Sequence, residues 1–210
     1  MKQKKLVLFD WGNIVESHTT GYNCYDAFDN LFRRCGCNID GRIFDQLDIY
    51  KLSKIKDEDE FKIVFEKMKE DLKLSVTYEE FKKIYYEEFD DIDYYQEVVD
   101  FEHSLSDKCY IGILSNLVIF DKERLNRQVN LSKYDYVFLS FELGLKKPNR
   151  DIFEYVESKL PFDKENILFI DDREDNIKVA KEMGWRTIHA TGLELDKIKS
   201  GVEEFLKVHD

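Results

Sequence analysis

The chain has 210 residues, of which 43% are hydrophobic, enough for one sizeable packed domain or for a core domain with a smaller companion. Its formal net charge of −12 and its lack of a lysine- or arginine-rich block argue against a nucleic-acid partner, because such proteins usually neutralise phosphates with clustered positive charge. No apolar run approaches the ~20 residues that cross a bilayer, and the sequence turns acidic at Asp10, too early for a signal peptide, so we expect a soluble, cytoplasmic protein that does not bind membranes.

The first predicted element is a buried strand in the stretch LVLFDWGN, from Leu6 to Asn13. Its apolar residues lead directly into Asp10. An ionised carboxylate at the tip of a buried strand costs desolvation energy unless a cation, hydrogen-bond donors or solvent meet it there. Asp10 is therefore the first candidate site residue, and the ring of Trp11 is expected to pack rather than react.

Amphipathic helices are predicted from about residue 28 to residue 101, where apolar residues recur at helical spacing between charged ones. One stripe comprises Phe61, Val64, Phe65, Met68 and Leu72, and another comprises Phe81, Ile84, Tyr85 and Phe89. We expect both stripes to form the core of a helical bundle and the charged residues to face solvent. The cysteines, at positions 24, 35, 37 and 109, lack paired Cys-x2-Cys knuckles and are expected to be reduced packing residues rather than zinc ligands.

Further short apolar runs follow the helical region: CYIGILSN, YVFLS, NILFIDD and RTIHAT. Short apolar runs that alternate with helical segments predict an α/β fold with a parallel sheet buried on both faces. Ligands bind such sheets at the carboxyl ends of the strands, so the residues that close the runs are candidate site residues. These are Asp10, Ser115, Asn116, Ser140, Asp171 and Asp172.

A lysine loop precedes the fourth run. In LGLKKPNRDIF, Pro148 is expected in the first turn of a helix, which places Lys146 and Lys147 in the loop just before it. A lysine near several carboxylates and a hydroxyl makes a coherent constellation, whereas any one of these residues alone is usually only solvated.

Four segments in this order, LFDWGN, ILSN, GLKKP and LFIDDREDN, resemble the four motifs of the haloacid dehalogenase (HAD) superfamily, over a span from Lys5 to Thr187. The resemblance implies a Rossmann-like hydrolase core of residues 1–15 and 100–210 and an inserted all-helical cap of residues 16–99. It implies that Asp10 is the catalytic nucleophile and that Lys147 is the cation between nucleophile and substrate.

The same resemblance implies substrate and metal contacts. Ser115, Asn116 and Gly12 would contact the substrate, and Mg2+ would be held by Asp10, Asp172 and the backbone carbonyl of Gly12. The physical requirement is clear, because attack of a carboxylate on a phosphate brings like charges together and needs positive charge to hold both. We therefore expect Mg2+-dependent hydrolysis of a small phosphorylated metabolite, sugar phosphates included, through an aspartyl-phosphate, by a monomer or a homodimer.

Gly12 departs from the family pattern. Most phosphatases that this chain resembles carry a second aspartate there, which protonates the leaving alcohol, and general acid catalysis contributes about 10²–10⁴ in rate. Two alternatives therefore stay open: a metal-free 2-haloacid dehalogenase, and a catalytically impaired binding protein of the same fold. Glu16 and His18 are candidates to replace the missing acid.

The start of the predicted cap carries an aromatic group that comprises Tyr22, Tyr25, Phe28 and Phe32. These side chains have the spacing to line a small substrate cleft, and the same spacing suits a buried helix face.

Overall fold

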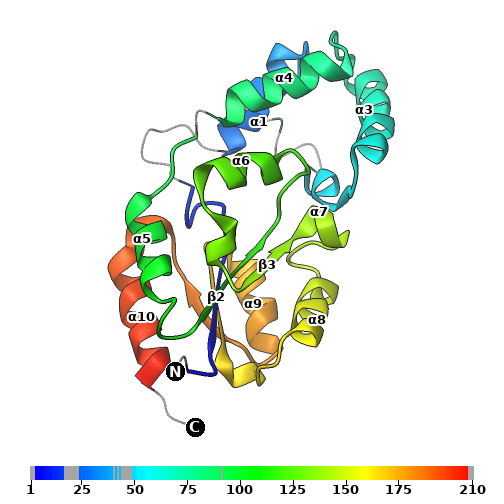
Figure 1. The fold of residues 1–210 in the computed structure, drawn as a ribbon. Coiled ribbons are helices and arrows are strands. Elements are labelled where there is room, and N and C mark those ends of the chain that lie inside the picture. Colours follow the sequence, from blue (N-terminus) through cyan, green and yellow to red (C-terminus); the bar gives the residue numbers. More distant parts are fainter. Residues whose placement is uncertain are drawn as a thin grey trace.

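A single parallel sheet organises the molecule. The computed structural model describes residues 3–16, 24–39, 41, 43, 49–90 and 92–207, and within these ranges five strands pair in the order β3-β2-β1-β4-β5 (Figure 1). The strands are β1 (Leu6–Phe9), β2 (Tyr110–Ser115), β3 (Tyr136–Leu139), β4 (Ile167–Asp171) and β5 (Arg186–His189). Each corresponds to one apolar run of the sequence, which confirms the α/β, Rossmann-like fold.

The register of the sheet brings the predicted site residues to one edge. Leu6 in the central strand β1 lies opposite Tyr110 of β2 and Ile167 of β4. Because all strands are parallel, Asp10 follows the end of β1 beside the ends of both neighbours, where β2 closes with Ser115 and β4 closes with Asp171.

Helices cover both faces of the sheet. On one face α5 (Gln96–Ser104), α6 (Asp121–Gln128) and α10 (Leu195–Lys207) pack against the sheet in one hydrophobic cluster (Figure 1). On the other face α8 (Arg150–Lys159) and α9 (Glu174–Glu182) form a second cluster. Shorter turns connect these elements: α7 (Ser140–Leu143), η2 (Leu131–Lys133), η3 (Lys164–Asn166) and η4 (Gly192–Glu194). No helix within the described ranges is both long enough and apolar enough to span a membrane.

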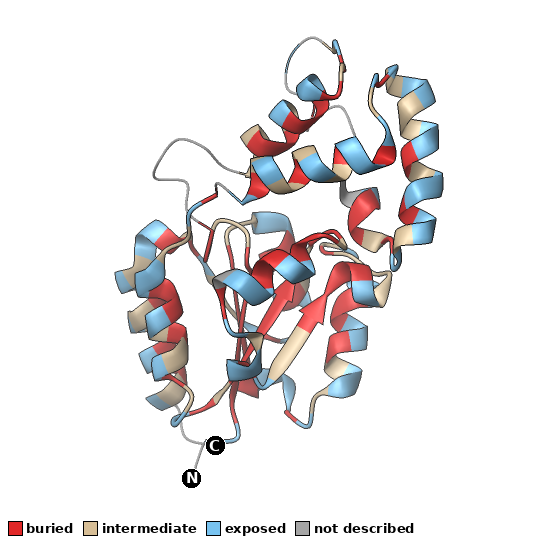
Figure 2. Cartoon of the chain, turned by 45° about the horizontal axis from the view of Figure 1, so that its top comes forward, coloured by how far each residue is buried: buried red, intermediate tan, exposed pale blue. Residues whose placement is uncertain are grey.

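A helical insertion between β1 and β2 lies over the carboxyl ends of the strands (Figure 1). It contains α1 (Cys24–Arg34), η1 (Ile49–Lys54), α3 (Glu58–Leu72) and α4 (Tyr78–Phe89). Phe61 and Phe65 of α3 and Phe81 and Phe89 of α4 are buried in a third hydrophobic cluster, which confirms the predicted stripes, and the outward faces of these helices are exposed (Figure 2). Cys35 and Cys37 are buried in the same cluster.

Local signals explain where the two long insertion helices begin. Asp57 precedes α3, and its side chain accepts a hydrogen bond from the backbone N–H of Glu60 at 2.8 Å. Thr77 precedes α4 and forms a capping box with Glu80. These caps satisfy backbone donors that a helix start would otherwise leave unpaired.

Two boundaries predicted from the sequence lie near the starts of helices α5 and α8. The proposed division after residue 99 falls inside α5, whose Val98 and Val99 pack against the sheet, so we propose that the core resumes before residue 96. The placement of Pro148 in a first helical turn is wrong, because α8 begins at Arg150 and Pro148 lies in the preceding turn. That turn is held by two hydrogen bonds between the Asn116 side chain and the backbone of Lys147, one donated by each residue.

Candidate active site

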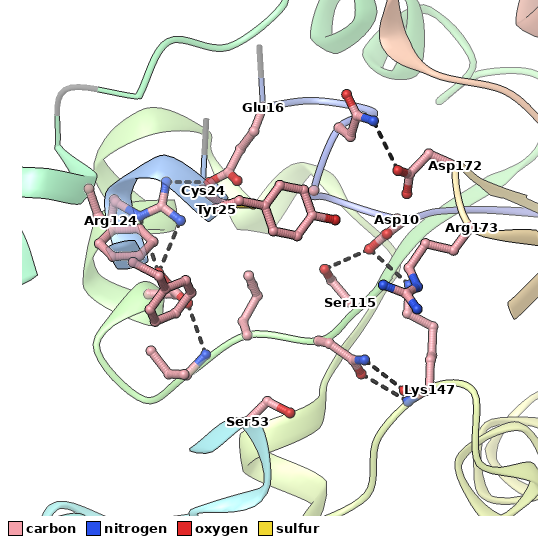
Figure 3. Close-up of a pocket in the computed structure, with 18 residues that line it drawn as sticks. Asp10, Glu16, Cys24, Tyr25, Ser53, Ser115, Arg124, Lys147, Asp172 and Arg173 are labelled. Carbon is pink, nitrogen blue, oxygen red and sulfur yellow. Dashed lines mark hydrogen bonds and ion pairs between the residues drawn. The ribbon is translucent and has the colours of Figure 1, made fainter. Parts of the chain in front are cut away.

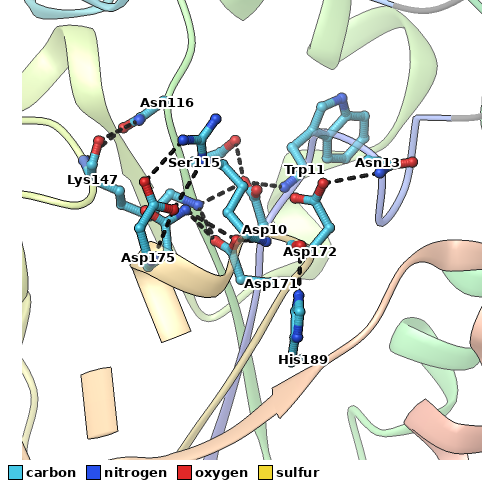
Figure 4. Close-up of polar contacts among 12 residues, drawn as sticks. Asp10, Trp11, Asn13, Ser115, Asn116, Lys147, Asp171, Asp172, Asp175 and His189 are labelled. Atoms are coloured by element: carbon cyan, nitrogen blue, oxygen red, sulfur yellow. Dashed lines mark hydrogen bonds and ion pairs between the residues drawn. The ribbon is translucent and has the colours of Figure 1, made fainter. Parts of the chain in front are cut away.

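Asp10 is oriented through one of its two carboxylate oxygens. Oδ1 accepts hydrogen bonds from the Trp11 backbone N–H and the Ser115 hydroxyl, both at 2.7 Å, and lies 2.9 Å from Lys147 Nζ (Figure 4). Oδ2 has no hydrogen-bond partner among the described residues. The carboxylate is 90% buried and aimed by its neighbours, which leaves one oxygen available for reaction.

Lys147 is a buried cation between two carboxylates. Its Nζ lies 2.6 Å from Asp171 Oδ2 and 2.9 Å from Asp10 Oδ1. Burial acts to lower the pKa of Lys147, but the charges of Asp10 and Asp171 outweigh burial and raise it, so the ammonium group stays protonated. The Asn116 side chain fixes the Lys147 backbone, donating to its carbonyl at 2.8 Å and accepting from its N–H at 2.9 Å.

Asp171 serves to position Lys147. Besides the lysine, its oxygens accept hydrogen bonds from the Arg173 backbone N–H at 2.8 Å and from the Asn176 side chain at 2.9 and 3.0 Å. Burial raises the pKa of Asp171 to about 7, against the lowering effect of Lys147. Both oxygens are thus already engaged, and Asp171 is less suited than its neighbours to bind a ligand.

Asp172 faces the cavity from the loop after β4. Its Oδ2 accepts a hydrogen bond from the Asn13 side chain at 2.9 Å, and its backbone carbonyl lies 2.8 Å from His189 Nε2 (Figure 4). Burial raises the pKa of Asp172, and the nearby charge of Asp10 raises it further. A nearby cation would therefore stabilise the ionised Asp172 carboxylate.

The charges of this edge fit a divalent cation. One oxygen each of Asp10, Asp171 and Asp172 lie within 4.8 Å of one another, and Lys147 balances only part of their negative charge. Carboxylate oxygens at such spacing are the hard ligands that Mg2+ prefers. Asp171 is already engaged, whereas Asp10, Asp172 and Gly12, the ligands expected from the sequence, all line the cavity.

A cavity of about 100 Å3 lies between the strand ends and the helical insertion (Figure 3). Asp10, Gly12, Ser115, Asn116, Lys147 and Asp172, all predicted from the sequence, line it. An added Cβ at Gly12 would meet nothing within 4 Å, so this position opens onto free space. The cavity is smaller than the ~300–1,000 Å3 typical of drug-sized ligands, which favours a small substrate.

The candidates from the insertion divide between this cavity and the interior. Tyr25 and Phe28 line the cavity, and Phe28 also belongs, with Phe32, to the buried hydrophobic cluster of the insertion. Glu16 also lines the cavity, 2.5 Å from Arg124 Nη1. His18 and Tyr22 lie outside the described residues.

Other residues at the strand ends have structural or supporting positions. Ser140 is buried and bonds the backbone of Leu117 through its hydroxyl, accepting at 3.0 Å and donating at 3.1 Å, so it braces the loop after β2. The sequence reasoning assigned no role to Asn13, Arg173 and Asn176, although all three lie within or beside the quoted motifs. Nothing in the sequence indicated that Arg124 is buried, because an arginine within a polar helical segment is usually exposed to solvent.

This chain is similar to known proteins in sequence and in fold. The family model of haloacid dehalogenase-like hydrolases matches residues 9–190. Among curated proteins, drimenol cyclase drtB of Aspergillus calidoustus is 33% identical over 55 residues, which is 26% of this chain and only 10% of that protein.

Solved structures share the fold at low identity. A predicted HAD-like hydrolase from Porphyromonas gingivalis has a TM-score of 0.75 and 22% identity, with 98% of each chain covered. A HAD family enzyme from Bacteroides thetaiotaomicron in complex with magnesium and inorganic phosphate has a TM-score of 0.69 and 20% identity, over 90% of this chain and 94% of that one. The L-2-haloacid dehalogenase from Xanthobacter autotrophicus with covalently bound chloropropionic acid has a TM-score of 0.58 and 14% identity, over 89% and 76%. With the family model matched over most of its length, the chain belongs to the haloacid dehalogenase-like hydrolase family.

Proposed function

We propose that this chain is a Mg2+-dependent phosphomonoester hydrolase that acts on a small phosphorylated metabolite through an aspartyl-phosphate on Asp10. The observation that carries the proposal is the excess of carboxylate at the strand ends. One oxygen each of Asp10, Asp171 and Asp172 lie within 4.8 Å of one another, and Lys147 pairs with Asp10 and Asp171 but not with Asp172. A site that lacked a cation would leave this buried negative charge uncompensated, which is costly.

The proposed metal ligands are Asp10, Asp172 and the backbone carbonyl of Gly12. Bound there, Mg2+ would supply positive charge between the nucleophilic carboxylate and the phosphate oxygens. The similar enzyme from Bacteroides thetaiotaomicron, crystallised with magnesium and inorganic phosphate, supports this choice of ion.

The protein's own groups would supply the nucleophile and part of the stabilisation of the phosphoryl oxygens. Asp10 Oδ2 would form a bond to phosphorus while the bond to the leaving-group oxygen breaks. Lys147 and Ser115, which contact Asp10 Oδ1, would stabilise the phosphoryl oxygens. Water then attacks the phosphorus of the aspartyl-phosphate, which releases inorganic phosphate and regenerates the Asp10 carboxylate.

Protonation of the leaving group is the step that this site supports least. Gly12 has no side chain, and Glu16 already forms an ion pair with Arg124. We therefore propose that the protein hydrolyses esters with acidic leaving groups faster than alkyl esters.

A screen of small phosphorylated metabolites, with and without Mg2+, tests the proposal. We expect Mg2+-dependent release of phosphate from wild-type protein and none from Asp10→Asn, which keeps the shape of the side chain without its nucleophilic charge. Release of chloride from a 2-haloacid in metal-free buffer would overturn the proposal in favour of a dehalogenase. Binding of phosphate esters without turnover of any ester or of acetyl phosphate would instead indicate a binding protein.

A further inference from the structure

The end of the cavity opposite Asp10 carries a second group of charges, in which Glu16 and Arg124 (Figure 3) are joined by Asp121, the ion-pair partner of Arg124. All three side chains are at least 95% buried. Arg124 Nη1 lies 2.5 Å from Glu16, and Arg124 Nη2 lies 3.0 Å from Asp121. The group faces the place where a leaving group would lie if the phosphate were at Asp10.

This charge group has more negative than positive charge. Two carboxylates surround one guanidinium, and no other charged side chain among the described residues lines this end of the cavity. A buried charge that is left unpaired is strongly destabilising, so a positively charged ligand group would be favoured here.

Glu16 is the carboxylate with capacity left. Asp121 Oδ1 accepts from the Tyr85 hydroxyl at 2.7 Å and from Arg124, and its Oδ2 accepts from the Val118 backbone N–H at 2.9 Å. Glu16 Oε1 lies 2.5 Å from Arg124 Nη1, whereas Glu16 Oε2 has no hydrogen-bond partner among the described residues. A donor on the ligand would complete the hydrogen bonding of Glu16 without disturbing Asp121.

Aromatic side chains border the same end. Tyr25 and Phe28 line the cavity, and the ring of Tyr25 lies between Glu16 and Asp10 (Figure 3). Aromatic faces attract ammonium groups electrostatically, whereas they offer nothing comparable to an anion. Ring and carboxylate therefore select for the same ligand charge.

We propose that the leaving group carries a positively charged amino group, so that the substrate is the phosphate ester of a short amino alcohol whose ammonium pairs with Glu16. This inference rests on the phosphatase function proposed above. The small cavity limits the leaving group to a few heavy atoms beyond the phosphate. A carboxylate or second phosphate in the same place would repel Glu16 and Asp121.

The test compares phosphoethanolamine, hydroxyethyl phosphate and phosphoglycolate as substrates of wild-type protein and of Glu16→Gln. In Glu16→Gln, Arg124 and Asp121 still pair one to one, so the charge group becomes neutral. Glu66→Gln, on the exposed face of α3, is the matched control. Because the same esters are given to each protein, differences in their intrinsic reactivity cancel when selectivity ratios are compared between proteins.

We expect wild-type kcat/KM to fall in the order phosphoethanolamine, hydroxyethyl phosphate, phosphoglycolate. The preference for phosphoethanolamine over hydroxyethyl phosphate should drop at least about tenfold in Glu16→Gln. This change corresponds to only part of the interaction energy of two opposite charges in close contact at an effective dielectric constant of about 20. The ratio should be unchanged in Glu66→Gln.

An unchanged ratio in Glu16→Gln would overturn the inference. If that variant does not fold, wild-type protein that accepts phosphoglycolate as well as phosphoethanolamine would overturn it equally. If acetyl phosphate is still hydrolysed, either result leaves the phosphatase proposal standing. Failure to hydrolyse acetyl phosphate and every ester tested would overturn both proposals.

Discussion

Restoring a carboxylate by Gly12→Asp should accelerate hydrolysis of alkyl phosphates selectively. Gly12 lines the cavity beside the nucleophile, and a Cβ added there meets no atom within 4 Å. Its φ lies outside the left-handed region, so a side chain brings no backbone strain. The new carboxyl group would lie near Asp10 and Asp172, whose negative charges favour its protonated, proton-donating form.

The size of the gain follows from the role of the missing acid. A well-placed general acid contributes about 10²–10⁴ in rate, and we expect the lower end because the surrounding residues are not arranged to aim the new side chain. Esters such as p-nitrophenyl phosphate, whose leaving group needs little protonation, should gain almost nothing.

The assay is kcat/KM for an alkyl phosphate and for p-nitrophenyl phosphate in wild-type protein, Gly12→Asp and Gly12→Asn. The asparagine variant fills the same space without an acid and separates proton donation from packing. Equal gains in both variants would refute the reasoning. Alkyl ester turnover that is already as fast as aryl ester turnover in wild-type protein would also refute it, because another residue would then supply the proton.

Three further outcomes are expected. Asp172→Ala should abolish both turnover and its stimulation by Mg2+, since one carboxylate rarely holds a strongly hydrated ion, and retained stimulation in a magnesium titration would contradict the ligand assignment. Burial raises the pKa of Glu102 to about 8, whereas in the unfolded chain the pKa lies near 4.5. Between these pH values the native state holds a proton that the unfolded state has lost, so the unfolding free energy should fall as the pH rises from about 5 to 8, by at most ~1.4 kcal/mol per pH unit. Urea titrations of Glu102→Gln should lack this slope. Tyr85→Phe removes the hydrogen bond that the insertion donates to Asp121 and leaves this buried carboxylate with one donor fewer. The unfolding free energy should fall by about 1–3 kcal/mol. An unchanged melting temperature would show that the bond is not needed.

The sheet could be predicted from the sequence because each strand is a short apolar run that ends in polar residues. That pattern places Asp10, Ser115 and Asp171 at one edge once the strands are taken as parallel, and the structure has them there. The helical stripes were equally legible, since Phe61 and Phe81 recur with neighbours at helical spacing.

Contacts between distant segments were not predictable. The pairing of Arg124 with Glu16 joins residues 108 positions apart, and nothing local marks either as buried. The different contacts of Asp171 and Asp172 could not be predicted either, because adjacent side chains at the end of a strand point in different directions. Asp171 pairs with Lys147, whereas Asp172 accepts a hydrogen bond from Asn13.

The most direct test of the account is the melting temperature in Mg2+ with and without beryllium fluoride, an anion complex that mimics a phosphoryl group on a carboxylate. Ligands that bind only the folded state raise its melting temperature, so wild-type protein should be stabilised when both Mg2+ and beryllium fluoride are present. Asp10→Asn should show no such rise, and neither should wild-type protein without Mg2+. No shift in wild-type protein at saturating beryllium fluoride, or an equal shift in Asp10→Asn, would contradict the claim that Asp10 accepts the phosphoryl group.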